Sequence, residues 1–272
     1  MIRRFILKHM VNMFGRKKKH YGFFWDLYRY SLDGMNYGWG DYAIKNASER
    51  NIFKLLAERT GDDVLIFDGG AHEGEYTANF MDYFRNSSKK ITVHAFEPMT
   101  ASMDKYKELT KEFTGTKFVY NELGLAEKAD KAPIFFNNDG SIIASIYKRQ
   151  LDYFDIDFDK ENTIELTTVD DYCRENKIEK LDLLKIVVEG SELRAIQGAE
   201  EMISAGKIGM IQFGFGGIAM DSRFYFRDFW NFFKDHGYTL YRVMIDGLLK
   251  IDHYDERYEV FQCVNFLAVN EK

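Results

Sequence analysis

Two acidic side chains follow short apolar runs, at places where the sequence predicts the ends of buried strands. Asp68 follows residues 64–67 and opens a glycine-rich turn, DGGAHEG (residues 68–74). Glu97 follows the next apolar run, residues 91–96. Ligands of open α/β sheets bind beyond the carboxyl ends of such strands. A carboxylate there can accept hydrogen bonds from both hydroxyls of a ribose, and this is the role predicted for Glu97.

The glycine-rich turn predicts close contact between the backbone and a ligand. Gly70 and Gly74 lack the Cβ that would clash with it, and the helix that follows offers free N–H groups. Such a turn can hold a pyrophosphate, or the amino-acid end of S-adenosylmethionine with Asp68 near its ammonium group. His72 would contact the same end. The turn is not GxGxxG, and an aspartate suits an ammonium better than a pyrophosphate, which argues against a nicotinamide-dependent oxidoreductase.

Two further strand ends carry polar groups. Asn121 and Leu123 follow a predicted strand over residues 117–120, where an adenine base would lie in such a fold. A strand over residues 181–188 delivers Lys185 and Glu189 to its carboxyl end. Glu189 is the nearest candidate for a general base on an acceptor hydroxyl, or else an acid that stabilises a helix N-terminus. Lys185 is a candidate ion-pair partner for such acids.

Helices and strands alternate from residue 48 onward. Strands separated by helices imply crossover connections, and therefore a mainly parallel sheet with helices on both faces. The stretch 132–167 interrupts the alternation with two strand-like runs and a segment that could cover a site. The last two strands, near residues 238–243 and 260–269, could pair antiparallel. Helices are expected over about 48–59 (capped by Ser48), 74–85, 99–113, 168–176, 191–204 and 223–236.

Four stretches carry a resemblance to a known family, the FkbM methyltransferases, which use S-adenosylmethionine. The resemblance implies an α/β protein with the Rossmann-like class I methyltransferase fold and a mainly parallel seven-stranded sheet. It also implies methyl transfer, usually to oxygen, on sugars, polyketides or related secondary metabolites. Cofactor contacts carry over to Asp68, Gly70, Glu97 and Asn121. The matching stretches are DGGAHEGEYT (residues 68–77), AFEP (95–98), NELGL (121–125) and LKIVVEGSELRAIQGA (184–199).

The sequence departs from this family's pattern at two positions. Members usually carry aspartate where this chain has Val187, and glutamate where it has Gly214. Both positions belong to predicted strand ends that lie side by side. If those acids bind a divalent cation or act on the acceptor hydroxyl, this chain lacks the expected ligands and should be impaired. Two interpretations therefore stay open: an O-methyltransferase acting on a sugar, glycan or small metabolite, and a catalytically impaired protein that binds the cofactor or a partner without turnover.

Composition and charge bound the remaining possibilities. The chain has 272 residues and a formal net charge of −6, which argues against a general nucleic-acid binder. Its two cysteines, far apart in sequence, predict reduced thiols and a cytoplasmic protein. The predicted division is an N-terminal basic and aromatic extension (residues 1–47), whose aromatic part should pack over the rest, and a methyltransferase domain (residues 48–272). Oligomeric state is not predicted.

The first twenty residues have an unusual charge. They contain seven basic residues and no acid, with apolar residues at helical spacing between them. This pattern is compatible with an amphipathic arm resting on an anionic membrane surface, which would place the protein peripherally at the inner membrane surface. A terminal helix packed on the domain and a solvated tail, which is what basic tails more often are, show the same pattern.

Overall fold

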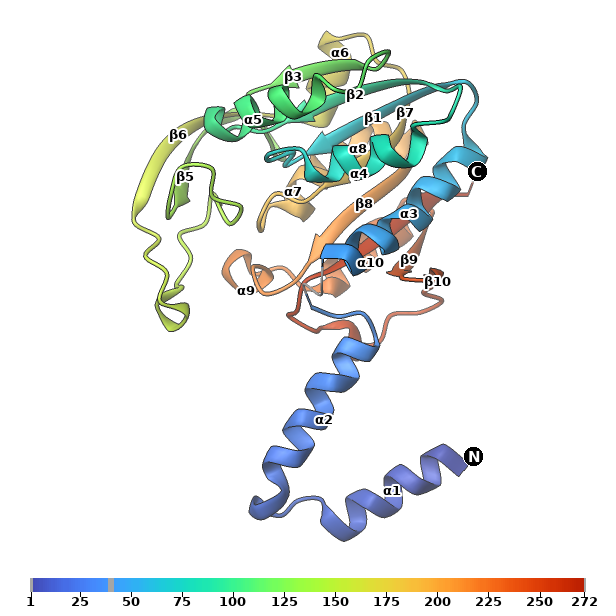
Figure 1. Cartoon of the computed structure of the whole chain (residues 1–272), viewed down its shortest axis with the longest axis vertical. Coiled ribbons are helices and arrows are strands. Elements are labelled where there is room, and N and C mark those ends of the chain that lie inside the picture. Colours follow the sequence, from blue (N-terminus) through green and yellow to red (C-terminus); the bar gives the residue numbers. More distant parts are fainter. Residues whose placement is uncertain (1, 39–41, 272) are drawn as a thin grey trace.

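The computed structural model describes residues 2–38 and 42–271, and its centre is a twisted sheet of eight strands (Figure 1). The strand order is β10-β9-β11-β8-β7-β1-β2-β3. Strands β3, β2, β1, β7 and β8 pair parallel, whereas β8, β11, β9 and β10 pair antiparallel. The strand bounds are β1 Asp63–Gly69, β2 Lys90–Phe96, β3 Lys117–Asn121, β7 Leu181–Ile186, β8 Ile208–Phe215, β9 Tyr238–Met244, β10 Gly247–Lys250 and β11 Val264–Asn270.

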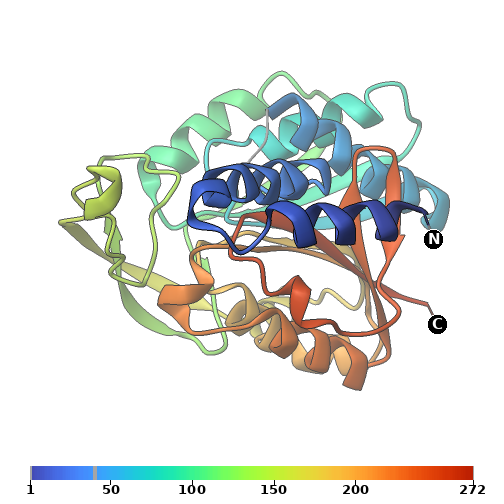
Figure 2. The same ribbon diagram turned by 90° about the horizontal axis from the view of Figure 1, so that it is seen from below.

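Consecutive residues of the central strands enter two different cores, because side chains alternate across a strand. Ile66 and Leu183 pack on one face of the sheet, whereas their neighbours Phe67 and Leu184 pack on the other. Helices cover both faces (Figure 2). The first face is covered by α3 (Tyr42–Arg59), α4 (Glu75–Phe84) and α5 (Thr100–Thr110), and the second by α6 (Val169–Glu175), α7 (Glu192–Gln197), α8 (Glu200–Ser204) and α10 (Phe226–Asp235).

This architecture confirms the predicted α/β fold with a mainly parallel sheet and the antiparallel pairing of the last two predicted strands. The predicted number of seven strands was wrong, because a short eighth strand, β10, extends the edge. It forms a hairpin with β9 in which Gly247 pairs with Met244. The dipeptide Asp246-Gly247 is a strong hairpin signal that the sequence analysis did not use.

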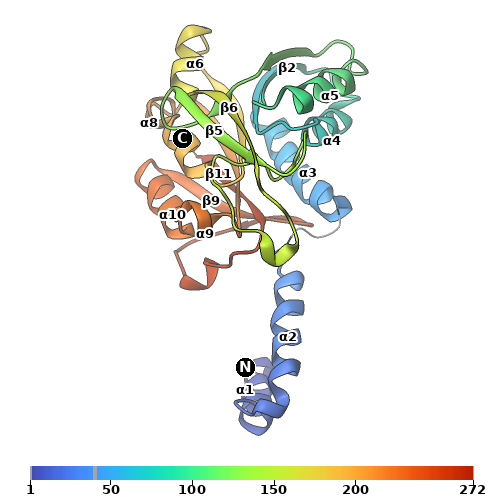
Figure 3. The same ribbon diagram turned by 90° about the vertical axis from the view of Figure 1, so that its left-hand side faces the viewer.

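A second, three-stranded sheet rises over the carboxyl edge of the large one (Figure 3). It consists of β4 (Gly124–Leu125), β6 (Lys160–Thr167) and β5 (Asp130–Phe136), with β5 and β6 antiparallel. The connection between β5 and β6 contains the short helix η2 (Asp152–Phe154). The predicted segment over a site therefore exists as a small sheet with a long connection.

Three predicted helix boundaries were wrong. Helix α3 begins at Tyr42, so Ser48 lies inside the helix and does not cap it. The helix predicted over 191–204 is two helices, α7 and α8. The helix predicted over 223–236 is preceded by a separate turn, α9 (Ala219–Ser222), and begins at Phe226.

The first two helices project away from the rest of the chain (Figures 1 and 3). They are α1 (Ile2–Phe14) and α2 (Tyr21–Gly34), joined by the short helix η1 (Lys18–His20). The predicted packing of this aromatic segment over the domain was wrong for α2, in which only Leu32 is buried. The chain docks just after α2, where Arg242 donates to the carbonyls of Met35 and Asn36. Trp39 lies outside the described residues. Among the described helices, none has the length and apolar character to cross a membrane.

The break between α7 and α8 occurs at Gly198, and its cause is a close backbone contact. A Cβ at this position would lie 2.0 Å from the carbonyl oxygen of Ala126. We expect Gly198→Ala to lower the free energy of unfolding by about 1–3 kcal/mol, the usual cost of forcing extra volume into a packed site. Gly61→Ala is the control, since a Cβ there would meet nothing within 4 Å. Urea unfolding of both variants tests this, and equal midpoints would contradict it.

Candidate active site

A cavity of about 200 Å³ lies at the carboxyl edge of the parallel strands, under the small sheet. The ends of β1, β2, β7 and β8 contribute Gly70, Glu97, Glu189 and Gly214 to its wall. Its other walls come from α3 and from the small sheet with its connection. The cavity therefore lies where ligands bind in open α/β sheets.

The glycine-rich turn joins β1 to α4 in an unusual conformation. Gly70, His72 and Gly74 all have positive φ, at 71°, 49° and 96°. A Cβ on Gly70 would lie 1.8 Å from the carbonyl oxygen of Val187, so no larger residue fits. Gly70 and Ala71 both donate their N–H groups to the carbonyl of Phe96, which ties the turn to β2. Gly70 and His72 line the cavity as predicted for cofactor contacts.

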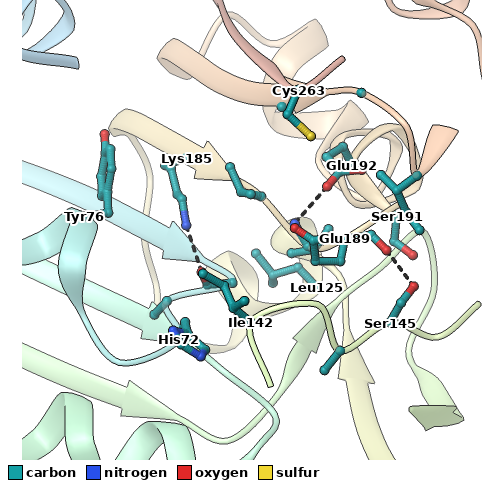
Figure 4. Close-up of a pocket in the computed structure, with 18 of the residues that line it drawn as sticks. His72, Tyr76, Leu125, Ile142, Ser145, Lys185, Glu189, Ser191, Glu192 and Cys263 are labelled. Carbon is teal, nitrogen blue, oxygen red and sulfur yellow. Dashed lines mark hydrogen bonds between the residues drawn. The ribbon is translucent and has the colours of Figure 1, made fainter. Parts of the chain in front are cut away.

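Asp68 does not reach the cavity, and this corrects its predicted contact with an ammonium group. Its carboxylate is fully buried, accepts a hydrogen bond from Thr77 at 2.8 Å and forms an ion pair with Lys185 at 2.9 Å. The Lys185 ammonium also donates to the carbonyls of Gly69 and Gly70 at 3.1 and 2.8 Å (Figure 4). Lys185 therefore ties the turn to Asp68 through two hydrogen bonds and one ion pair, whereas the predicted ion-pair partner was an acid such as Glu189.

Glu97 lines the cavity as a buried carboxylate with spare acceptor capacity. Its two oxygens accept from the backbone N–H groups of His72 and Met99, at 3.0 and 2.9 Å. Burial raises the pKa of Glu97. The two hydrogen bonds from the backbone oppose that rise, and so do the nearby positive charges. Each oxygen keeps a lone pair for a ligand donor, since a carboxylate offers about four acceptor positions.

The other three predicted cofactor residues lie away from the cavity wall. Asn121 is occupied within the fold, because its amide donates to the carbonyl of Ala95 at 3.0 Å and its oxygen accepts from Tyr172. Leu123 packs against the core on the face of the sheet that α6, α7, α8 and α10 cover. Gly74 lies against Tyr106 and Leu109 of α5, where a Cβ would approach to 2.7 Å.

The apolar wall comes from residues that the sequence analysis passed over. They lie directly after Leu123 and on the small sheet: Gly124, Leu125, Ala126, Ile134, Ile164 and Leu166. This wall stands beside Glu97 and is suited to the flat face of an adenine. The predicted residues Asn121 and Leu123 of the motif NELGL thus lie off the wall, whereas Gly124 and Leu125 of the same motif line it.

Glu189 occupies a strained turn that is held by its neighbours. Its φ is 50° and that of Gly190 is 105°. The carboxylate of Glu192 accepts from the N–H groups of Val188 and Gly190, both at 2.9 Å, and the Ser145 hydroxyl donates to the Glu189 carbonyl at 2.6 Å (Figure 4). A residue in this region of backbone space persists only where the surroundings over-determine it. The turn thereby aims the Glu189 side chain at the cavity.

The environment of the Glu189 carboxyl suits proton transfer near neutral pH. Burial and, to a smaller extent, the nearby Glu192 raise its pKa to about 7, against the opposing effect of Arg149, Lys185 and Lys45. The Arg149 guanidinium lies 3.5 Å from Glu189 and 3.6 Å from Asp221. A carboxyl with this pKa can accept a proton at physiological pH, whereas an ordinary glutamate is too weak a base.

The two positions at which the family's acids are missing face each other across neighbouring strands. Both line the cavity, and a Cβ on Gly214 would lie 3.9 Å from each Val187 methyl. The prediction that they lie side by side is therefore correct. The consequence is an apolar spot on the wall between Lys185 and Glu189. No group of three His, Cys, Asp or Glu side chains that could hold a metal ion exists in the described ranges 2–38 and 42–271.

Helix α3 contributes an acid that the sequence analysis missed. Glu49 is 2% exposed, lines the cavity and accepts from the side-chain amides of Asn79 and Asn265, both at 3.3 Å. Burial raises the pKa of Glu49. A signal was available, because Glu49 precedes the buried Ile52 and Phe53 by three and four residues and so shares their helix face.

Cys263 also lines the cavity, and burial raises the pKa of its thiol to about 12, so it is a neutral thiol at pH 7.

The residues present fit S-adenosylmethionine. The buried Glu97 carboxylate can accept from ribose hydroxyls, the apolar wall beside it can hold the adenine, and the turn at Gly70 and His72 leaves room beside the backbone for the amino-acid end. The fold and this site define a class I methyltransferase.

A family model matches more than half of the chain. Residues 68–240 match the family model described as the methyltransferase FkbM domain. The chain belongs to the FkbM family of S-adenosylmethionine-dependent methyltransferases. A search of curated proteins found no significant match.

Solved structures of low sequence identity are similar to the chain. An FkbM methyltransferase from Methylobacillus flagellatus is 19% identical, with a TM-score of 0.48, over 76% of this chain and 44% of that one. This chain therefore covers less than half the length of that protein. A precorrin-6y C5,15-methyltransferase from Geobacter metallireducens is 12% identical (TM-score 0.41, over 81% and 88% of the chains). Mycoplasma TrmK, determined with S-adenosyl-homocysteine (M. capricolum), is 12% identical (TM-score 0.39, over 81% and 68%).

Removing Lys185 should destabilise the fold through Asp68. We expect Lys185→Met to lower the free energy of unfolding by about 3–5 kcal/mol, because it leaves a buried charge without its partner. The double variant Asp68→Asn with Lys185→Met should recover most of that loss. Urea unfolding of the single and double variants measures both effects. A double variant no more stable than Lys185→Met would show that the ion pair is not the source of the effect.

Proposed function

We propose that the chain is an O-methyltransferase acting on a hydroxyl of a sugar, a glycan or a small secondary metabolite. The observation that carries this proposal is the Glu189 carboxyl, which lines the cavity with a pKa of about 7. When bound, S-adenosylmethionine supplies an electrophilic methyl group on a sulfonium centre. The protein then has to align the acceptor, exclude water and take up the hydroxyl proton.

The proton is the task we assign to Glu189. Burial raises the pKa of its carboxyl and makes it a stronger base, and the positive charges of Arg149 and Lys185 limit that rise. Lys185 acts on this site as a positioning residue, because its ammonium donates to the carbonyls of Gly69 and Gly70 and pairs with Asp68.

The wall from α3 and its preceding segment supports a hydroxyl-rich acceptor. Asn36, Glu49 and Asn265 bring amide and carboxylate groups to the wall of the cavity. Amides and carboxylates hydrogen-bond sugar hydroxyls, and such convergent polar groups fix a ligand's orientation.

The second candidate function is cofactor binding without turnover. Val187 and Gly214 favour it, because they present apolar surface at the two strand ends where the family carries acids. The two functions separate in one assay with labelled S-adenosylmethionine and a panel of sugars, glycans and phenolic metabolites. Label transfer to any hydroxyl supports the enzyme, whereas tight cofactor binding with no transfer across the panel supports the alternative.

Substitution of Glu189 should change both the rate and its pH dependence. The pKa of Glu189 is about 7, so its carboxylate form, which is the base, becomes populated as the pH rises through 7. Below pH 7, turnover should therefore fall about tenfold for each unit by which the pH is lowered. Glu189→Gln should lower turnover at least tenfold (~1.4 kcal/mol of activation free energy) and abolish this rising limb. Initial rates from pH 5.5 to 8.5 measure both.

The matched control for this substitution is Glu122→Gln. Glu122 is exposed, pairs with Lys107 and does not line the cavity. The control should keep the wild-type profile. A Glu189→Gln enzyme with the wild-type rate and the same rising limb would remove Glu189 from the mechanism.

A further inference from the structure

The projecting helices α1 and α2, with η1 between them, leave their apolar side chains uncovered. We call residues 2–34 the basic arm. Fourteen of the twenty-two exposed large apolar side chains in the described part of the chain lie within residues 2–35. A soluble surface rarely keeps so much apolar area together unless it binds something. The most exposed in each helix are Ile2, Phe5 and Ile6 in α1 and Tyr21, Tyr30 and Trp25 in α2.

The apolar and polar residues of α1 separate by helical spacing. Ile2, Ile6 and Met13 recur on one side, whereas Arg4, Lys8 and Asn12 follow each other at intervals of four on the other. Such a helix can lie in an interface with its apolar side down. Trp25 and the tyrosines of α2 are the residues that prefer the headgroup level of a bilayer.

The charge of the arm is opposite to that of the rest of the chain. The basic arm contains eight basic and two acidic residues, a net charge of +6, so the other residues, with twenty-nine basic and forty-one acidic ones, carry a net charge of −12. None of the ion pairs between described side chains uses Arg4, Lys8 or the basic run 16–19. An anionic surface would attract the arm and repel the domain, and so orient the molecule.

We propose that the basic arm binds the surface of an anionic lipid bilayer. Helix α1 turns sideways at the far end of α2 (Figure 1), which lets α1 lie flat while α2 connects it to the domain. Asn36 and Gly38, which follow α2, line the cavity, so the arm holds the candidate active site near that surface. The proposal depends on the arm alone and not on the proposed reaction.

Vesicle sedimentation of the full chain tests the proposal. Vesicles of phosphatidylcholine with about one third phosphatidylglycerol should bind the protein at least tenfold better than phosphatidylcholine alone, and raised salt should weaken the binding by screening. Replacing Lys8, Arg16, Lys17 and Lys18 with glutamate should lower the bound fraction at least tenfold. Phe5→Ser with Trp25→Ser should lower it as well, since the apolar contact is removed while the charge is kept.

The matched control replaces four exposed lysines of the domain with glutamate, at Lys128, Lys131, Lys180 and Lys250. It changes the net charge equally and should leave vesicle binding within about twofold of wild type, as charges far from the contact are screened. Equal loss in the control would overturn the proposal, as would equal binding to neutral vesicles. A dimer in light scattering that fails to bind vesicles and dissociates in the arm variant would assign the arm to a second copy instead. Circular dichroism confirms that each variant is folded.

Discussion

The buried ion pair between Lys185 and Asp68 is the interaction on which the site depends. It links β7 to β1 beneath the glycine-rich turn, and the same ammonium binds the carbonyls of Gly69 and Gly70. A charge pair removed from water needs further hydrogen bonds to offset the lost hydration, and here Thr77 donates to Asp68 while the two carbonyls accept from Lys185. The turn is therefore fixed before any ligand arrives, and Gly70, His72 and Glu97 keep their places at the wall.

The second fixed element is the turn that carries Glu189. Glu192 accepts from its backbone and Ser145 donates to it, so a strained conformation is maintained by ordinary hydrogen bonds. The raised pKa of the Glu189 carboxyl arises mainly from its burial. Glu49, Glu189 and Glu192 line the cavity with their carboxyls, and that of Glu192 is engaged by the N–H groups of the turn itself. If Glu189 takes up the acceptor proton, the base of this chain lies on the turn after β7, and the two strand-end positions hold Val187 and Gly214.

The sequence predicted the strand alternation, the segment over the site and five of the residues at the wall, because short continuous apolar runs and glycine-rich turns are local signals. It could not predict whether a polar side chain faces a ligand or another residue. Asp68 and Asn121 were assigned to the cofactor, yet Lys185 and Tyr172 occupy them across 117 and 51 positions of the chain. Such pairings depend on strand order. The predicted packing of α2 on the domain was wrong for a related reason. Many aromatic residues in one segment indicate that it has to be covered, but not whether the same chain or another molecule covers it.

Calorimetric titration with S-adenosyl-homocysteine tests most directly whether this cavity is the cofactor site. The account predicts micromolar binding by the wild-type chain, loss of at least a hundredfold in affinity (~2.7 kcal/mol) in folded Glu97→Ala, and unchanged affinity in Glu122→Ala. The large loss is expected because a buried carboxylate that receives ribose hydroxyls cannot be replaced by solvent. Absence of binding at millimolar ligand, or equal affinity in Glu97→Ala, would contradict it.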